Sequence, residues 1–560
     1  MCGIIGIVGA SATADRARML AGRDLMRHRG PDDAGLWEAP GVSLGARRLA
    51  ILDLSPAGHQ PMHSNDARDT IVFNGEVYNC AELRRELRHD FRFRGHSDTE
   101  VMLNGYRRWG LRGLVDRADG MFAFAIWDGS RRRLSVARDR VGKKPLFYSH
   151  QGRSLYFASV LNVLLEILPG TPTVDPHALD AFLVYQAVPS PLSMFEGVRQ
   201  LQPAHTLTFD ADTGACAVER YWSVSYRSKT TESEREVVEQ VTSLARTAVR
   251  KRLMADVPVG VFLSGGVDSS IVAGLAAEEH GAPIEAVAMG FGETEFDERR
   301  YARAVAARAG IRLHEEVLKP DLVADLPGIA WHYGQPVADG SIVPNHYLSA
   351  AAVRWMRVAL NGDGGDELFG GYARPLVERV AGPYRRMLPP EARQWLGSRL
   401  GGFRGRLGRR LSMLANAGAT TPAEAFTYGR AFRGVRDAAY TGDLRSAVGD
   451  WHPDSIYRRA WDAADADEDV DRALYGDFST YLPDQLLAKA DIASMAHSLE
   501  ARSPLLDTAL IEYAARIPTA MRFRQLQTKH VLKQVAAQFA PNFVIHRRKR
   551  GFVMPASLWL

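Results

Sequence analysis

The stretch Val259-Gly-Val-Phe-Leu-Ser-Gly-Gly-Val-Asp-Ser-Ser270 indicates how the second half of the chain folds. An apolar strand leads into two glycines, and a helical pattern follows at once. Glycine lets backbone N–H groups turn inward with no Cβ in the way, and a helix N-terminus presents unpaired donors and a positive dipole end. The stretch therefore predicts a phosphate-binding loop, with a glycine-rich turn and ordinary helix caps as the alternative. It lacks the Gly-x4-Gly-Lys-Ser/Thr spacing, so the loop is of another type.

Strand and helix patterns alternate around this loop. In chain order they are a helix at 233–254, a strand at 259–263, a helix at 269–279, a strand at 284–289 and a helix at 297–309. This βαβ rhythm predicts a parallel sheet with helices on its faces. From about residue 450 the pattern is almost wholly helical, and it includes the polar and apolar positions of 481–507.

A second glycine-rich turn, Asn361-Gly-Asp-Gly-Gly-Asp-Glu367, follows an apolar strand. Its three carboxylates suit Mg²⁺ and phosphates, because magnesium favours oxygen ligands. A calcium loop is the alternative, but the required twelve-residue spacing with a late glutamate is missing. In the first loop, Ser264, Ser269 and Ser270 add hydroxyl donors, and Asp268 can hold a hard cation.

The first half of the chain reads as short strands separated by turns, with two helical patches. The strands are at 3–8, 42–52, 70–73, 121–127, 133–138 and 154–158, and the helices are at 81–87 and 100–109. This mixture predicts an α+β sandwich. The next stretch is polar, rich in Ser and Thr and weakly periodic, as linkers are. The sequence thus predicts a first domain at 2–209, a linker at 210–234 and a second domain at 235–560.

The bulk composition argues against several classes of protein. The 560 residues carry a formal net charge of +5 and are 46% hydrophobic and 24% charged, which gives no case for nucleic acid as an obligatory partner. Three widely spaced cysteines cannot build a disulfide framework, so we expect a reducing, cytoplasmic setting. No run approaches the roughly 18 apolar residues that a membrane span needs. The apolar start of the chain is interpreted as a buried strand rather than as a signal peptide.

Cys2 is a candidate nucleophile. Removal of Met1, which a small second residue favours, would make Cys2 the first residue. Its thiolate is a strong nucleophile, and the freed α-amine, whose ordinary pKa is about 7.7–8.0, can take the thiol proton. Taken alone, Cys2 is more commonly explained as a small apolar residue that begins a buried strand.

Other polar positions of the first half favour catalysis. Arg48 can bind an α-carboxylate through two parallel hydrogen bonds. Asn74 stands beside Gly75, whose N–H is unhindered, and such a pair suits an oxyanion hole. Asn-Gly also forms hairpin turns, which is the alternative here. Asp98 begins a helix, where it either caps the helix or holds an ammonium group.

Motifs in both halves, in a fixed order, resemble those of one family. The first half has Cys2-Gly-Ile-Ile-Gly6, Arg27-His-Arg-Gly-Pro-Asp-Asp33, Arg48-Leu49, Phe73-Asn-Gly-Glu76, Ser97-Asp-Thr-Glu100 and Arg138-Asp-Arg-Val-Gly-Lys-Lys-Pro-Leu-Phe-Tyr148. The second half has Leu263-Ser-Gly-Gly-Val-Asp-Ser-Ser270, Gly362-Asp-Gly-Gly-Asp-Glu-Leu-Phe-Gly-Gly-Tyr372, Ser494-Met495, Glu500, Arg502, Pro504, Asp507 and Lys549-Arg-Gly-Phe552. Over nearly its whole length, the chain resembles the glutamine-hydrolysing asparagine synthetases.

The resemblance implies an N-terminal Ntn-type αββα sandwich, followed by an ATP-pyrophosphatase domain with a parallel sheet and a helical C-terminal part. In the first domain it makes Cys2 the nucleophile, and the glutamine-binding residues are Arg48, Asn74, Gly75, Glu76 and Asp98, with Asn74 and Gly75 as the oxyanion hole. The ATP site is lined by Leu263, Ser264, Gly265, Gly266, Asp268, Ser269, Met289, Asn361 and Gly362. The implied magnesium ligands are Asp268 and Asp366, the other implied catalytic residues are Asp363 and Lys549, and weaker candidates are Lys489 and Glu500.

The implied reaction has two parts. Cys2 attacks glutamine and releases ammonia, while the β-carboxylate of aspartate is adenylated by MgATP. Ammonia then reaches β-aspartyl-AMP through an internal channel, and asparagine, AMP and pyrophosphate are formed. Small molecules are the expected partners, with neither nucleic acid nor membrane, and the assembly considered is a homodimer.

Four positions depart from the family pattern. At these positions the family commonly has Glu in place of Val160 and an acid in place of Gln335. It commonly has Ser in place of Asn361 and Arg in place of Ile492. They leave the acceptor open, so an amidotransferase acting on another carboxylic acid is the main alternative. A non-catalytic scaffold and a sugar-phosphate amidotransferase are further alternatives. The intact Cys2 argues against the non-catalytic scaffold. The loop after Val259 argues against the sugar-phosphate amidotransferase, which has no need of it.

Overall fold

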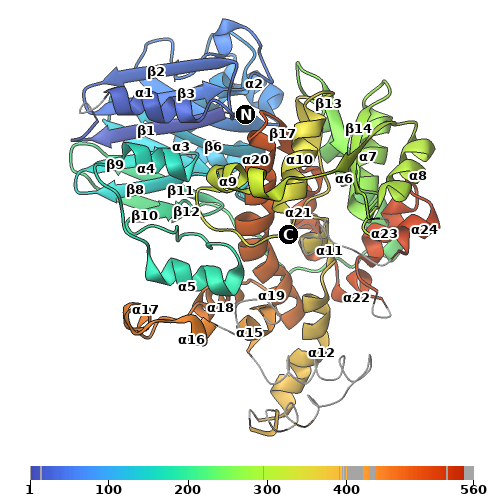
Figure 1. Cartoon of the computed structure of the whole chain (residues 1–560). Coiled ribbons are helices and arrows are strands. Elements are labelled where there is room, and N and C mark those ends of the chain that lie inside the picture. Colours follow the sequence, from blue (N-terminus) through green and yellow to red (C-terminus); the bar gives the residue numbers. More distant parts are fainter. Residues whose placement is uncertain are drawn as a thin grey trace.

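The structure, a computed structural model, describes residues 2–12, 16–293, 295–389, 391–393, 395, 399, 421–427, 436–524 and 527–547. Figure 1 shows a strand-rich first part in blue and cyan beside a second part, green to red, that surrounds a smaller sheet. No helix of these described ranges combines the length and the apolar character needed to cross a membrane.

Two antiparallel sheets of six strands form the first part, which runs from Cys2 to the end of the last of these strands at Arg220. The second part begins with the helix that starts at Glu234. The first sheet has the order β10, β8, β9, β1, β3, β2 and the second the order β12, β11, β7, β6, β5, β4. Their strands are β1 (Cys2–Gly9), β2 (Asp33–Ala39), β3 (Val42–Arg48), β4 (Met62–His63), β5 (Asp69–Val77), β6 (Gly120–Asp128), β7 (Arg133–Arg138), β8 (Phe147–Gln151), β9 (Ser154–Ala158), β10 (Val198–Gln200), β11 (His205–Asp210) and β12 (Cys216–Arg220).

The two sheets pack face to face, with helices on their outer faces. Buried apolar side chains of both sheets, such as Leu44 and Phe209, share one cluster between them. Two helices contact each other and the first sheet, and two others pair beside the second sheet. The first two are α1 (Arg16–Leu25) and α4 (Leu161–Ile167), and the other two are α2 (Cys80–Leu87) and α3 (Asp98–Arg117). This confirms the predicted αββα sandwich.

The second part is built on a parallel sheet of five strands in the order β15, β14, β13, β16, β17. Alternate residues of a strand face opposite sides, so Val287 packs in one cluster while its neighbours Ala286 and Ala288 pack in another. Helices therefore cover both faces, as predicted. The strands are β13 (Val259–Phe262), β14 (Glu285–Phe291), β15 (Arg312–Leu318), β16 (Val358–Leu360) and β17 (Glu500–Arg502).

The remaining elements are helical. They are η1 (Pro56–Gly58), α5 (Pro176–Tyr185), α6 (Glu234–Arg252), α7 (Val267–Glu279), α8 (Arg299–Ala309), α9 (Leu322–Tyr333), α10 (Ile342–Ala352), α11 (Gly365–Phe369), α12 (Ala373–Met387), α15 (Pro422–Thr427), α16 (Arg436–Ala439), α17 (Gly442–Val448), α18 (Asp454–Asp462), α19 (Asp469–Gly476), η2 (Asp477–Leu487), α20 (Ala488–Met495), η3 (Pro504–Leu506), α21 (Thr508–Arg516), α22 (Thr519–Arg522), α23 (His530–Ala536) and α24 (Asn542–Ile545). The expected helical C-terminal part is therefore present.

The helical prediction for 481–507 is wrong at its C-terminal end. The π-helix η2 and then α20 follow the pattern, but Ser498 has a φ of +54° and the chain then enters β17. The reason is that β17 pairs in parallel with β16, so sheet hydrogen bonds determine the conformation of residues whose spacing also suits a helix. Arg502, at the end of β17, is fully buried as a result.

The segment 210–234, predicted as a linker, begins within a sheet. β12 lies in this segment and pairs with β11, with Phe209 opposite Cys216. A polar strand can form there because β12 is the edge strand of its sheet, and four of its five residues are exposed. The second sheet thus extends to residue 220, past the predicted domain end at 209.

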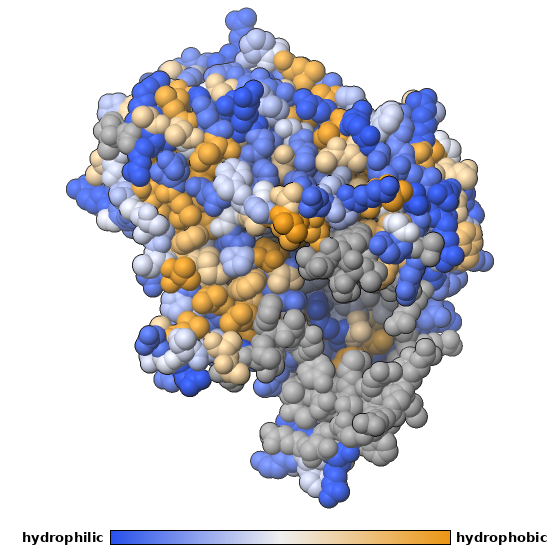
Figure 2. All heavy atoms as spheres, viewed as in Figure 1, coloured by the Kyte–Doolittle hydropathy of each residue, from blue (hydrophilic) through white to orange (hydrophobic). Residues whose placement is uncertain are grey.

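The surface of this face is mainly polar. Figure 2 shows blue, hydrophilic atoms over its top and right, with apolar atoms interspersed and most frequent to the left below the centre, where Figure 1 places α5. Among the catalytic candidates that the structure describes, Cys2 and Asn74 are buried, so they do not contribute to this surface.

Candidate active sites

Cys2 and Asn74 meet between the two sheets of the first part. Cys2 begins β1 and is buried, and its backbone N donates to Asn74 Oδ1 at 3.0 Å. Asn74 Nδ2 is buried with no hydrogen-bond partner among the described residues. An unpartnered amide donor beside a sulfur nucleophile fits the stabilisation of an oxyanion.

The alternative of a hairpin turn at Asn74-Gly75 is wrong. Both residues lie inside β5, where Asn74 is opposite Ala123 and Gly75 is opposite Phe122 of β6. A Cβ on Gly75 would come 2.2 Å from the carbonyl oxygen of Met121, so only glycine fits. The sandwich packing, and not the local turn preference, sets this conformation.

Burial raises the pKa of the Cys2 thiol. Thiolate formation therefore needs a base close by. The sequence predicts that the nitrogen of Cys2 itself, freed by removal of Met1, is that base. Gln60, which the sequence did not single out, also reaches the site: its Nε2 lies 3.9 Å from Cys2 Sγ, and its Oε1 accepts from Phe73 N at 2.7 Å.

Arg48 lies directly opposite Cys2 in the pairing of β1 with β3. Its guanidinium donates to the carbonyl oxygens of Leu52 at 3.2 Å, Ser55 at 3.3 Å and Asp53. Arg48 therefore holds the loop after β3. A guanidinium has five N–H donors, so this role is compatible with the predicted contact to a ligand carboxylate.

Glu76 and Asp98 form a buried acidic pair near Cys2. Burial, more than any neighbouring charge, raises the pKa of Glu76 well above its usual range and that of Asp98 to about 6. Within the described part of the chain, Glu76 Oε1 has no hydrogen-bond partner. Ser97 rather than Asp98 caps α3, whereas Asp98 accepts from Val77 N at 2.9 Å. The helix-cap alternative for Asp98 is thus wrong, and two buried acids suit an ammonium group.

The predicted phosphate loop follows β13 and leads into α7. Gly265 has a φ of +66°, and a Cβ there would come 2.5 Å from Tyr301. Ser264 Oγ lies 3.0 Å from Ser269 Oγ, and Ser270 Oγ donates to Gly266 O at 2.7 Å. The turn is therefore tight, held by its own hydroxyls, and placed at a helix N-terminus, a position that favours anions.

A cavity of about 500 Å³ opens in front of this loop. It is lined by the predicted residues Leu263, Ser264, Gly266, Asp268, Ser269, Met289, Asn361, Gly362, Asp363, Asp366 and Lys489. Gly265 shapes the turn without lining the cavity, and Glu500 lies elsewhere, beside Arg502. Lys549 lies outside the described residues.

Asp268 and Asp366 converge on one cation, Lys529. Its Nζ lies 2.5 Å from Asp268 Oδ2 and 2.6 Å from Asp366 Oδ1. The two aspartates thus share a place for positive charge. Mg²⁺ commonly takes one or two carboxylates and completes its shell with phosphates and waters, so this pair fits the predicted metal. Lys529 was missed because nothing in its local sequence indicates the contact, which spans 261 residues.

Asp363 and Lys489 lie across the same cavity. Burial raises the pKa of Asp363 to about 6, and Asn361 Nδ2 donates to its Oδ2 at 2.7 Å. Lys489 Nζ lies 3.0 Å from Asp339 Oδ2 and donates to Ser341 Oγ at 2.6 Å. Asp339 and Ser341 were also missed from the sequence. Together these groups can bind and move protons at an acceptor acid.

Buried ion pairs join the two sites. Arg29 of the first part donates from Nε to Cys2 O at 3.3 Å and from Nη2 to Asp491 Oδ2 of α20 at 2.8 Å. Lys144 also pairs with Asp491, at 3.0 Å. Beside them is a smaller cavity, lined from both parts by residues that include His28, Arg29, Gln200, His332, Gln335, Lys489 and Ile492.

Two family models cover nearly the whole chain. The model described as "Asparagine synthase" matches residues 240–560, and the "Glutamine amidotransferase domain" matches residues 1–222. These matches agree with the phosphate loop in the second part and the Cys2 site in the first.

Several full-length relatives are similar. A "Putative asparagine synthetase [glutamine-hydrolyzing]" of Mycobacterium bovis is 35% identical over 100% of this chain and 88% of its own length. "Asparagine synthetase [glutamine-hydrolyzing] 1" of Bacillus subtilis is 32% identical over the same shares. A protein named "Amidase chry2" of Gibberella zeae is 29% identical over 96% of this chain and 84% of its own. The chain therefore belongs to the glutamine-hydrolysing asparagine synthetase family and is a glutamine-dependent carbon–nitrogen ligase.

Proposed function

We propose that this protein makes asparagine from aspartate, with glutamine as nitrogen donor and ATP as activating nucleotide. The observation that carries the proposal is the cavity between the two sites. Arg29 lines it and holds the carbonyl of Cys2, while Lys489 lines both this cavity and the nucleotide cavity. We take this cavity as part of a buried route by which ammonia released at Cys2 reaches an activated acid, away from bulk water that would protonate it.

In the first half-reaction, Cys2 Sγ attacks the amide carbon of glutamine. The thiol proton passes to the α-amine of Cys2, freed by removal of Met1, and then to the departing nitrogen, which leaves as ammonia. The N–H groups of Asn74 and Gly75 stabilise the oxyanion. Water then hydrolyses the thioester to glutamate. Glu76 and Asp98 bind the α-ammonium of the substrate, and Arg48 binds its α-carboxylate.

In the second half-reaction, a β-carboxylate oxygen of aspartate attacks the α-phosphorus of ATP and pyrophosphate leaves. Backbone donors and hydroxyls of residues 263–270 hold the leaving group. Asp268 and Asp366 would hold Mg²⁺, which when bound neutralises phosphate charge. Ammonia then attacks the acyl carbon and AMP leaves. Asp363 can accept the proton that the nitrogen loses, and Lys549 is proposed, from its motif alone, to stabilise the developing charge.

A second candidate is the same chemistry on another carboxylic acid. Asn361, which stands where the family commonly has Ser, contacts Asp363 directly, and Gln335 stands in the wall of the connecting cavity. Both positions are close to where an acceptor would lie. A relative named as an amidase also aligns over most of the chain.

Pyrophosphate release by the purified full chain separates the two candidates. The protein would receive MgATP, with either glutamine or ammonium chloride, and either L-aspartate or a panel of other carboxylic acids. We expect pyrophosphate and asparagine in equal amounts with aspartate. Release with another acid and none with aspartate would refute asparagine synthesis and support the second candidate. The resemblance also led us to consider a homodimer, and light scattering of the purified protein would measure its mass in solution.

A further inference from the structure

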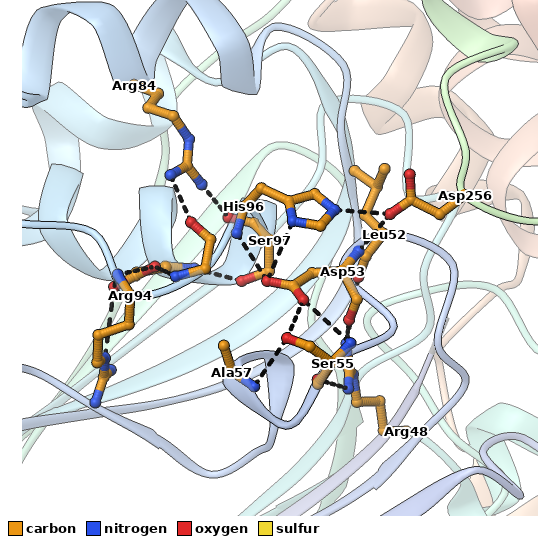
Figure 3. A network of polar contacts seen from close by, with 12 residues as sticks. Arg48, Leu52, Asp53, Ser55, Ala57, Arg84, Arg94, His96, Ser97 and Asp256 are labelled. Atoms are coloured by element: carbon orange, nitrogen blue, oxygen red, sulfur yellow. Dashed lines mark hydrogen bonds and ion pairs between the residues drawn. The ribbon is translucent and has the colours of Figure 1, made fainter.

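Asp256 makes three contacts across the boundary between the two parts. It lies in the second part, between α6 and β13, three residues before Val259. Its backbone N donates to Ile51 O at 2.9 Å. Its Oδ2 accepts from Asp53 N at 2.8 Å and lies 2.8 Å from His96 Nε2. Figure 3 shows the carboxylate pointing at both groups.

The first of these groups belongs to the loop that Arg48 holds. Asp53 has a φ of +58°, a conformation that a non-glycine residue adopts only when its surroundings enforce it. Its carbonyl accepts from Arg48, and its buried carboxylate accepts from Ser55 Oγ at 2.5 Å and from His96 N at 2.7 Å. The bond from Asp53 N to Asp256 therefore helps to hold a strained residue on which the position of the Arg48 guanidinium depends.

The second group, His96, lies two residues before Asp98 in the chain. His96 and Ser97 immediately precede Asp98, and Ser97 Oγ caps α3 while its carbonyl accepts from Arg84 at 3.0 Å. Because Nε2 of His96 can bond to a carboxylate only if it carries the proton, Asp256 also orients the imidazole. The carboxylate thus fixes both segments that carry the proposed carboxylate-binding and ammonium-binding residues of the glutamine site.

We infer that Asp256 is a positioning residue for glutamine, supplied to the first part by the second. It does not touch the reacting atoms. It holds Arg48 and Asp98 at the separation that the α-carboxylate and α-ammonium of glutamine require, so the glutamine site is complete only when the two parts are docked. This inference rests on the proposed function of the first part but not on the identity of the acceptor acid.

The test uses the full chain and three variants. Asp256→Ala removes both acceptor interactions, Asp256→Asn keeps one acceptor oxygen, and Lys251→Met is the control. Lys251, at the end of α6, pairs across the same boundary with Asp119 at 2.7 Å and touches none of the residues of Figure 3. The rate of glutamate formation, with glutamine as the only substrate, gives KM and kcat for each variant. A titration of glutamine into the same variants, each also carrying Cys2→Ala to prevent turnover, gives Kd.

We expect Asp256→Ala to raise KM and Kd for glutamine by about tenfold, the lower end of the range for lost hydrogen bonds to a charged group, because the contact with His96 is exposed. The increase for Asp256→Asn should be smaller, kcat should fall less than KM rises, and Lys251→Met should match wild type. Ammonia-supported pyrophosphate release should persist in all three, which excludes general misfolding. A wild-type KM and Kd in Asp256→Ala, or equal losses with glutamine and ammonia, would overturn the inference. Failure of the wild type with aspartate and ammonia would instead refute the acceptor assignment.

Discussion

The guanidinium of Arg502 lies 3.3 Å from the carboxylate of Glu76, so strand β17 of the second part meets strand β5 of the first. Arg502 also pairs with Glu500 at 2.6 Å and donates to Arg252 O and Met254 O. All three charged side chains are buried. A member of the proposed glutamine site is thus tied to the sheet that carries the nucleotide loop.

Arg502→Met should destabilise the protein strongly. It leaves the buried carboxylates of Glu500 and Glu76 without their cation, and breaking such a pair typically costs about 3–5 kcal/mol. The apparent melting temperature by scanning calorimetry measures the loss. Adding Glu500→Gln to Arg502→Met should recover part of it, because one unpaired charge is removed.

The matched control for this prediction is Arg312→Met. Arg312 pairs with Glu285 at 2.9 Å, but its side chain is 64% exposed. Exposed pairs contribute little, so the change should stay within about 0.5 kcal/mol. Equal effects of Arg502→Met and Arg312→Met would contradict the role given to the buried cluster.

Cys2→Ala should separate the two half-reactions. Glutamine-supported amide formation should fall below detection because the nucleophile is gone, while the ammonia-supported reaction continues near the wild-type rate. Amide product is measured with each nitrogen source. Cys216→Ala, at the half-buried cysteine of β12, should leave both reactions unchanged. Persistence of glutamine use in Cys2→Ala would show that the nucleophile lies elsewhere.

Lys529→Met should increase the affinity of the nucleotide-free protein for a divalent cation. The ammonium of Lys529 occupies the place between Asp268 and Asp366 where a metal would bind, so a cation must displace it. We expect Mn²⁺ to bind about tenfold more tightly without it, because removing one cation from beside the two carboxylates strengthens their attraction for another. Titration followed by electron paramagnetic resonance measures this directly. Lys533→Met, one turn along α23, is the control, and equal Mn²⁺ affinity in wild type and Lys529→Met would contradict the prediction.

Asp98→Asn should stabilise the protein above pH 6 and not below pH 4. The unfolded carboxyl has a pKa of about 3.9, and burial raises the folded value to about 6. The folded state therefore binds the proton more tightly, and its stability falls as pH rises through this window and stays low above it. Asparagine removes that penalty, which is of the order of 1–3 kcal/mol, and its side-chain oxygen can still accept from Val77 N.

Melting temperatures of wild type and Asp98→Asn between pH 4 and pH 8 test this sign. The two curves should converge at the acid end and separate toward neutrality. Asp90→Asn, at a side chain that is 46% exposed, should show no such divergence. The same Asp98→Asn change should weaken glutamine binding, as expected where a functional site carries a destabilising charge. A greater stabilisation at pH 4 than at pH 8 would contradict the assignment.

Local patterns in the sequence were enough to predict several features. Two of these features depend only on neighbours along the chain, so periodicity and turn chemistry identify them. They are the strand, glycine turn and helix around Gly265, and the apolar strand that begins at Cys2. The same logic was insufficient at Asn74-Gly75, where a turn preference yields to sheet pairing, and at Glu500–Arg502, where a helical spacing yields to pairing with β16.

The sequence by itself thus determined the residue types of two predicted sites: a cysteine and an asparagine amide in the first part, and a glycine-rich loop with acidic residues in the second. Only the tertiary structure decided which distant groups complete them. Lys529 meets Asp268 across 261 residues, and Asp256 meets Asp53 across 203. Such contacts leave no periodic trace, because they arise when separately patterned elements pack together and bury charges that must then find partners.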